Sequence, residues 1–233
     1  MTRNRILRPA VVLAVLTLVL TACDLYAPGT PRPYWCDPTD TAVNDGMTPS
    51  FDAVYSTPKG PLSMADCRQL TFQIVAAQSF ASQYPTVADV TRAGWIQAAV
   101  WDPGQGVHYV DPSRITGPFD PQRPNWLMYD GTAPTSKLAG MMFLVSSGSR
   151  PPAGFPGGND QWHQHGPLCN KANAVPFIVG ENMSDAACAA LGGVNVNYSS
   201  LWMVHVWLPE YAGWQATDIF NMTNPMLGDM PMS

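Results

Sequence analysis

The sequence predicts an α+β fold in which N-terminal helices pack on a curved antiparallel sheet, and an incomplete barrel is one form this sheet could take. Apolar residues recur at helical spacing over residues 63–94, and short apolar segments separated by Pro- and Gly-rich turns follow Trp95. The 23 Pro and 19 Gly stand against three Lys and two Glu. Long exposed helices usually contain many Lys and Glu, so this composition argues against a coiled coil or a helical bundle.

Residues 1–22 are predicted to be a lipoprotein signal peptide. Arg3, Arg5 and Arg8 precede an apolar stretch over residues 10–20, which is shorter than the roughly 20 residues needed to span a bilayer. The stretch ends in Leu-Thr-Ala before Cys23, which resembles the bacterial lipobox, where the Cys is lipidated and becomes the first mature residue. An ordinary secretory signal with an incidental Cys is the alternative. We therefore expect a protein of the bacterial cell envelope, outside the cytoplasm and lipid-anchored to the membrane.

The charge of the chain limits its partners. The net charge is −5 over the whole sequence, and removal of residues 1–22 would leave nine basic and seventeen acidic residues, a net of −8. Such a surface is repelled by anionic headgroups, so the lipid on Cys23 would have to supply the attachment. The acidic balance and the lack of a Lys/Arg run argue against nucleic acid as a partner.

Residues 23–62 are predicted to be a Pro-rich tether, and a single α+β domain is expected over residues 63–221. The tether is rich in Pro, Asp, Thr and Gly and has no periodicity, although Trp35, Phe51 and Tyr55 favour some order in it. Ser63 and Thr86 each precede an Asp by three residues, which predicts two capped helices, one ending at Pro85 and a short one ending near Gly94.

Strands are expected from residue 95 onward. Residues 126–129 and 137–145 flank a turn that begins Asp130-Gly131, which predicts an antiparallel hairpin. Further strands are expected over residues 177–179 and 202–208, with His205 and Trp207 on the face opposite to Val204 and Val206. Ser184 should begin a short helix that ends before Gly192.

Residues 222–233 are expected to form a Met-rich tail. Met222, Met226, Met230 and Met232 lie within it. Thioethers are soft ligands that suit Cu(I), but an apolar tail without a ligand is the simpler interpretation.

The four cysteines beyond Cys23 predict two disulfides, because an even number of Cys in an oxidising compartment usually pairs. Three pairings are possible. We favour Cys36–Cys67 with Cys169–Cys188, since each closes a local loop. Free thiols that bind a metal are the alternative.

The four histidines are the candidate functional residues: His108, His163, His165 and His205. All four lie in segments that are predicted to be strands. Residues two apart on a strand share a face, so His163 and His165 should point to the same side of the sheet. Imidazoles that converge from neighbouring strands can bind one divalent transition metal, and zinc, copper, iron and manganese all accept this ligand. Asp160, Asn170 and Glu181 are candidate oxygen ligands or hydrogen-bond partners of the ligands. The alternative is that these histidines are hydrogen-bonded residues of the core.

Several of these motifs together resemble a group of uncharacterised bacterial secreted proteins and lipoproteins. The motifs are Gly-Val-His108-Tyr, Trp-His163-Gln-His165 followed by Leu168-Cys169, Cys188 before Gly192-Gly193, and His205-Val-Trp. The resemblance covers roughly residues 65–220. It supports the grouping of the histidines and the Cys169–Cys188 pair but implies no reaction.

Three functions remain open from the sequence. The first is an envelope-anchored lipoprotein with a histidine-lined pocket that binds a metal ion or a small ligand. The second is a metal-dependent enzyme that uses the same histidines. The third is a structural envelope protein whose histidines belong to the core.

Overall fold

The computed structural model describes residues 32–37, 51–55, 59–208, 219–224 and 226–228. The chain divides into two compact units, Met1–Pro33 and Tyr34–Ser233, and all the described helices and strands lie in the second. Cys23 and the predicted signal peptide lie outside the described residues. Within the described ranges, no helix combines the length and the hydropathy needed to cross a bilayer.

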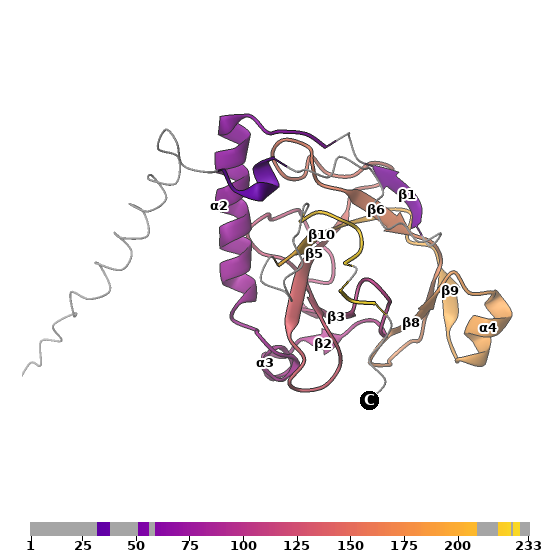
Figure 1. Ribbon diagram of the computed structural model, residues 1–233. Coiled ribbons are helices and arrows are strands. Elements are labelled where there is room, and N and C mark those ends of the chain that lie inside the picture. The colour runs from indigo at the N-terminus through magenta and orange to yellow at the C-terminus, as the bar shows by residue number, and fades with distance from the viewer. Residues whose placement is uncertain (1–31, 38–50, 56–58, 209–218, 225, 229–233) are drawn as a thin grey trace, which may run out of the picture. The chain divides into compact units, whose positions relative to one another are not determined.

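The larger sheet has seven strands, each antiparallel to its neighbours (Figure 1). In spatial order they are β1 (Phe51–Tyr55), β6 (Trp162–His165), β10 (Leu201–Trp207), β5 (Leu138–Ser146), β4 (Trp126–Tyr129), β3 (Val107–Val110) and β2 (Ile96–Gln97). The edge strands β1 and β2 do not pair with each other, so this sheet is open and does not close into a barrel. The predicted α+β class is confirmed.

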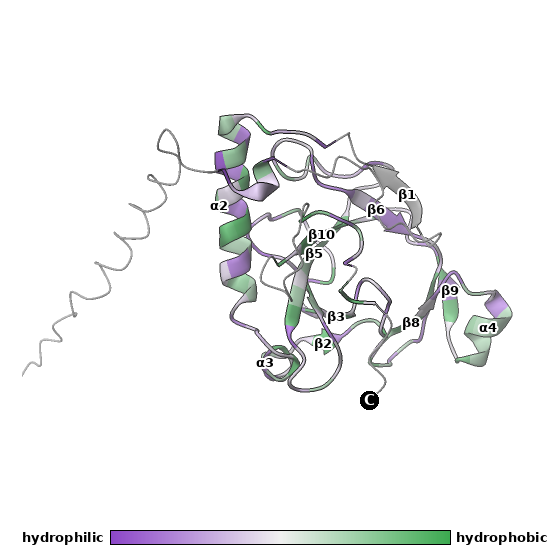
Figure 2. Cartoon of the chain, viewed as in Figure 1, coloured by the Kyte–Doolittle hydropathy of each residue, from purple (hydrophilic) through white to green (hydrophobic). Residues whose placement is uncertain are grey.

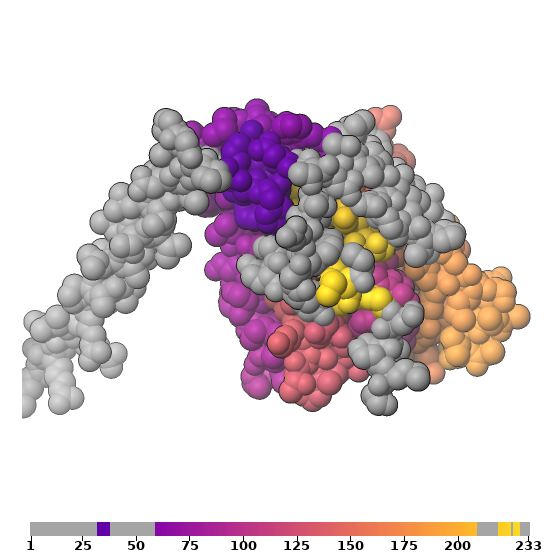
Figure 3. Space-filling model, viewed as in Figure 1, coloured from indigo at the N-terminus to yellow at the C-terminus, as the bar shows by residue number. Residues whose placement is uncertain are grey.

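A smaller sheet of three strands carries one of the two disulfides. Its order is β8 (Ile178–Glu181), β7 (Leu168–Asn170) and β9 (Val194–Val196). Helix α4 (Asp185–Ala190) joins β8 to β9, and the Ser184 side chain caps it by accepting from the backbone N–H of Ala187 at 3.2 Å. The Cys169–Cys188 disulfide ties this helix to β7. Figure 3 shows this region, in orange, as a projection from one side of the unit.

The predicted N-terminal helices are confirmed as α2 (Met64–Ala81) and α3 (Val87–Arg92). Ser63 and Thr86 accept from the backbone N–H groups of Asp66 and Asp89, as the capping pattern requires. Helix α2 alternates hydrophobic and hydrophilic residues along its length (Figure 2). The second disulfide joins it through Cys67 to Cys36, in the 3-10 helix η1 (Tyr34–Cys36), so both favoured pairings are confirmed.

The two faces of the larger sheet have different neighbours. Tyr129 lies on one face and donates to the backbone carbonyl of Tyr84, just after α2, so the helical segment covers this face. An aromatic cluster also packs there, with ring centroids of Phe119, Phe143 and Trp162 linked at 5.4–5.5 Å. The opposite face carries a second part of the core, which includes Trp126, Met128, Met142, Leu144, Met203 and Trp207.

The strand predictions are confirmed where the sequence alternates clearly. The hairpin of β4 and β5 forms in antiparallel register, and β10 follows the predicted alternation. Strand β1 falls within the stretch predicted as a tether, and β2, β7 and β9 were not predicted. Their segments are only two to five residues long, too short for periodicity to distinguish a strand from a loop.

Candidate functional site

Strands β6 and β10 bring three of the histidines to one face of the larger sheet. Met203 on β10 lies opposite His163 on β6, so both side chains point to the same face. His205 follows Met203 by two residues and His165 follows His163 by two, which places them on this face as well.

His108 reaches the same face from β3. Across the sheet, His108 pairs with Met128 of β4, Met128 pairs with Gly140 of β5, and Gly140 pairs with Trp207 of β10. Residues paired in this way point to the same face. Because Trp207 shares a face with His205, so does His108. The described structure therefore gathers all four histidines of the chain on the side of the sheet away from α2.

The four imidazoles form a row. The ring centroids of His165 and His163 are 5.5 Å apart, those of His163 and His205 are 4.9 Å apart, and those of His205 and His108 are 6.0 Å apart. All four rings are buried, and His163 and His205 have no exposed surface. In the part of the chain that the structure describes, no three His, Cys, Asp or Glu side chains already stand in an arrangement that would hold a metal ion.

Three of the rings use Nδ1 in a hydrogen bond to an oxygen acceptor. Nδ1 of His163 lies 3.1 Å from the carbonyl of Gln161, and Nδ1 of His205 lies 2.8 Å from the carbonyl of Met222. Nδ1 of His165 lies 2.5 Å from Oε1 of Glu181. A neutral imidazole that donates from Nδ1 keeps its lone pair on Nε2. For His205, that Nε2 atom has no hydrogen-bond partner among the described residues.

Burial favours the neutral form of three of the rings, those of His108, His163 and His205. It lowers the pKa of His205 to about 3, and it lowers the pKa values of His108 and His163 well below their ordinary value. Neighbouring imidazoles lower these pKa values further, because two charged rings would repel each other. Neutral imidazole is the form that accepts a hydrogen bond or binds a metal.

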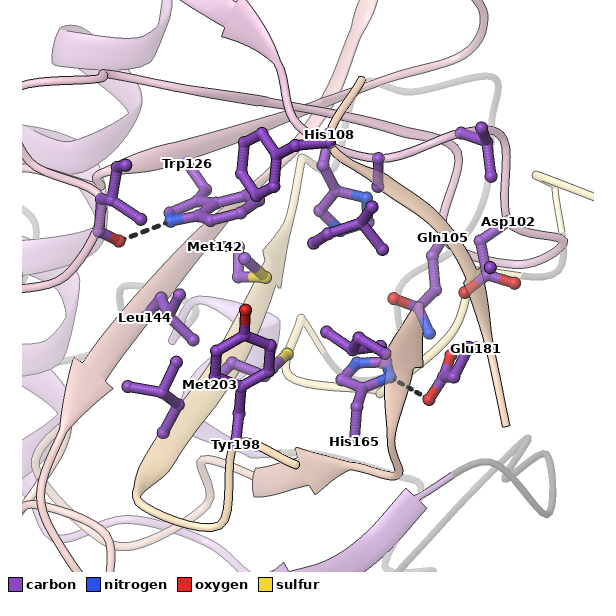
Figure 4. Close-up of a pocket in the computed structure, with 18 of the residues that line it drawn as sticks. Asp102, Gln105, His108, Trp126, Met142, Leu144, His165, Glu181, Tyr198 and Met203 are labelled. Atoms are coloured by element: carbon purple, nitrogen blue, oxygen red, sulfur yellow. Dashed lines mark hydrogen bonds and ion pairs between the residues drawn. The ribbon is translucent and has the colours of Figure 1, made fainter. Parts of the chain in front are cut away.

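A cavity of about 210 Å³ opens beside the row of histidines. His108 and His165 line it, whereas His163 and His205 lie outside the described lining. Figure 4 shows that one end is polar and the other apolar. The apolar lining comes from the larger sheet and from the segment that leads into β8, and it includes Trp126, Met142, Leu144, Phe177, Ile178 and Met203.

The polar end of the cavity holds two carboxylates and an amide. Glu181, on β8, binds His165, while Asp102 and Gln105 come from the turn between β2 and β3. Burial, helped by the charge of Glu181, raises the pKa of Asp102 to about 6. The Gln105 side chain is 2% exposed and makes no hydrogen bond within the described structure.

The predicted oxygen partners separate into three situations. Glu181 lies beside His165 and lines the cavity. Asn170 instead accepts from the Tyr198 hydroxyl. The Asp160 carboxylate accepts from the Phe155 backbone and the Trp162 indole, away from the histidine face.

Sequence reasoning missed Asp102 and Gln105. They lie in the segment Trp101-Asp-Pro-Gly-Gln105-Gly, where Pro and Gly signal only a turn. The turn is placed over the histidine face by its contacts with the C-terminal segment, since Asn224 donates to the carbonyl of Gly104 at 2.7 Å and Leu227 is buried in the core. Part of the stretch predicted as a Met-rich tail therefore packs here, and Met222 is fully buried.

Comparisons with protein-family models, with curated proteins and with solved structures find no match to this chain.

Proposed function

We propose that this protein is an envelope lipoprotein whose pocket binds a small organic molecule with an apolar body and a polar head. The observation that carries the proposal is the division of the cavity into an apolar end and a polar end (Figure 4). Small-molecule sites are mostly apolar, with a few polar groups that fix the orientation of the ligand. Trp126, Met142 and Leu144 would hold the body, and His108, His165 and Glu181 would face the head.

The proposed location rests on Cys23 and on the disulfides. The two disulfides are typical of proteins outside the cytoplasm. The lipobox before Cys23 adds a lipid anchor to that location.

Filling the cavity tests the binding proposal. Ala99 lines the cavity, so the substitution Ala99→Phe should place a ring inside it and abolish ligand binding. Val194→Phe is the matched control, because Val194 is 70% exposed on β9 and lies outside the lining. Binding would be followed by calorimetry with small alcohols and amines. Equal binding by both variants would contradict the proposal.

A metal ion bound by the row of histidines is a second candidate. Ligating histidines usually donate their other ring nitrogen to a carbonyl or a carboxylate, as Nδ1 does in His163, His165 and His205. Centroids of rings that share one ion lie roughly 5 Å apart, since each ligating nitrogen is about 2.0–2.1 Å from the metal. The spacings of 4.9 and 5.5 Å are close to that value. The rings would have to turn for their nitrogens to meet at an ion.

Elemental analysis tests the metal. The purified protein should contain about one zinc, copper, iron or manganese ion per chain, and the double variant His163→Asn/His165→Asn should contain none. A matched Asn170→Asp variant should retain the ion, because Asn170 bonds to Tyr198 rather than to a histidine. Full metal content in the double variant would rule the site out. A bound ion open to the cavity would also be the starting point for the alternative function, a metal-dependent enzyme that activates water.

A further inference from the structure

We infer that the ligand of this pocket carries a protonated amine, which Asp102, Glu181 and Gln105 receive at the polar end of the cavity. The inference rests on the proposed function and names the chemical class of its ligand. Figure 4 shows the three side chains grouped on one side of the cavity, across from Leu144.

The charges around the cavity favour a cation. Its described lining contains two carboxylates, Asp102 and Glu181, and neither Lys nor Arg. His165 shares its Nδ1 hydrogen with Glu181, while no hydrogen bond to the side chain of Asp102 forms within the described structure. Asp102 is half-buried, and both this burial and the nearby charge of Glu181 disfavour its charged form, so a cationic ligand would relieve that cost.

Gln105 provides a second, independent indication of a ligand. Its side chain is almost completely buried, lines the cavity and has no partner in the described structure. Because the amide lines the cavity, a ligand there can supply the hydrogen bond that the described residues do not. Its carbonyl oxygen can accept a hydrogen bond from an amine.

The number of acceptors also matches an ammonium group. A primary ammonium has three N–H donors, and the polar end offers oxygen atoms from three side chains. A carboxylate head would instead meet two like charges. An alcohol could donate only one hydrogen bond and would leave Asp102 without a countercharge.

A panel of matched heads on two bodies tests the inference. Hexylamine, hexanol and hexanoate, and benzylamine, benzyl alcohol and benzoate, would be titrated by calorimetry into the full chain in nanodiscs, with empty nanodiscs subtracted. At pH 7, each amine should bind at least 10-fold more tightly than its alcohol, and the carboxylates should not bind. Asp102→Asn should remove most of this preference. The control Asp120→Asn, at an acid outside the cavity, should retain the preference.

The outcomes separate the two proposals. If the alcohols bind and Ala99→Phe abolishes that binding, but the amines bind no more tightly, the pocket stands and the ammonium head is wrong. An amine preference that survives in Asp102→Asn and in Glu181→Gln also refutes the assignment. If none of the six probes binds, the proposed pocket function itself fails.

Discussion

His205→Gln should reverse its effect on stability as the pH falls. At pH 7 the substitution disturbs the hydrogen bond to the Met222 carbonyl in a fully buried site, and it should cost about 1–3 kcal/mol. At acidic pH the native state of the unsubstituted protein is destabilised because His205 stays unprotonated in it, and the variant has no such loss. The pKa of His205 is lowered from 6.5 to about 3, so the unfolded chain takes up a proton that the native state does not. This contribution to stability is fully present above pH 6.5 and is lost as the pH falls toward 3.

The size of that loss follows from the pKa values. At pH 4 the histidine should cost the native protein about 3 kcal/mol relative to pH 7, since each pH unit below 6.5 is worth about 1.4 kcal/mol. The variant should therefore be less stable than the native chain at pH 7 and equally or more stable at pH 4. His108, His163, Asp102 and Asp160 also have shifted pKa values, but they are present in both proteins and largely cancel in the difference.

Chemical denaturation at pH 7, 5.5 and 4, with both disulfides kept oxidised, measures the difference directly. The free energy of unfolding of each protein would be obtained by linear extrapolation, with equal denaturant dependence as the check that both unfold in the same way. A difference that stays constant across the three pH values would show that His205 is not a neutral buried imidazole in the native state.

Three further results are expected. Cys23→Ser should remove the N-terminal lipid and release the protein from the membrane, and unchanged detergent partitioning with an unchanged lipid mass would contradict the lipobox. Replacing both cysteines of Cys169–Cys188 should lower the free energy of unfolding by about 3 kcal/mol, and replacing both of Cys36–Cys67 by about 4 kcal/mol, because their sequence separations are 19 and 31 residues. Peptide mapping that finds crossed pairs would refute the assignment. Gly140→Ala should destabilise the fold by about 1–3 kcal/mol in thermal unfolding, because the added Cβ would lie 2.8 Å from the Trp207 ring. The control Gly117→Ala has open space around the added Cβ, so it should change stability by less than about 0.5 kcal/mol.

Local chemistry explains which parts of the fold the sequence could predict. The caps at Ser63, Thr86 and Ser184 act over three residues, and the alternation in β10 acts over two, so both can be read from neighbouring positions. Strand β1 could not be predicted in the same way. It is a strand because β6 pairs with it from more than one hundred residues away along the chain.

The candidate site could also be predicted only where it depends on neighbouring residues. His163 and His165 share a face by local alternation, but the approach of His205 and His108 depends on the order of strands β6, β10, β5, β4 and β3. Asp102 and Gln105 depend on contacts between a turn and a segment more than one hundred residues later. No local sequence pattern predicts contacts between such distant segments, so the polar end of the cavity can be recognised only from the fold.

The arrangement of the histidines bears on whether they are only core residues. A buried imidazole whose Nε2 lacks a hydrogen bond, as in His205, costs stability that Leu or Met at the same position would not. The neighbouring positions on this face do carry Met142, Met203 and Trp207, which pack without such a cost. Histidines that only stabilised the fold would be poor choices beside these residues. The row of buried imidazoles has its outer members on a cavity that also holds two carboxylates, and this arrangement favours the proposed ligand over a purely structural role.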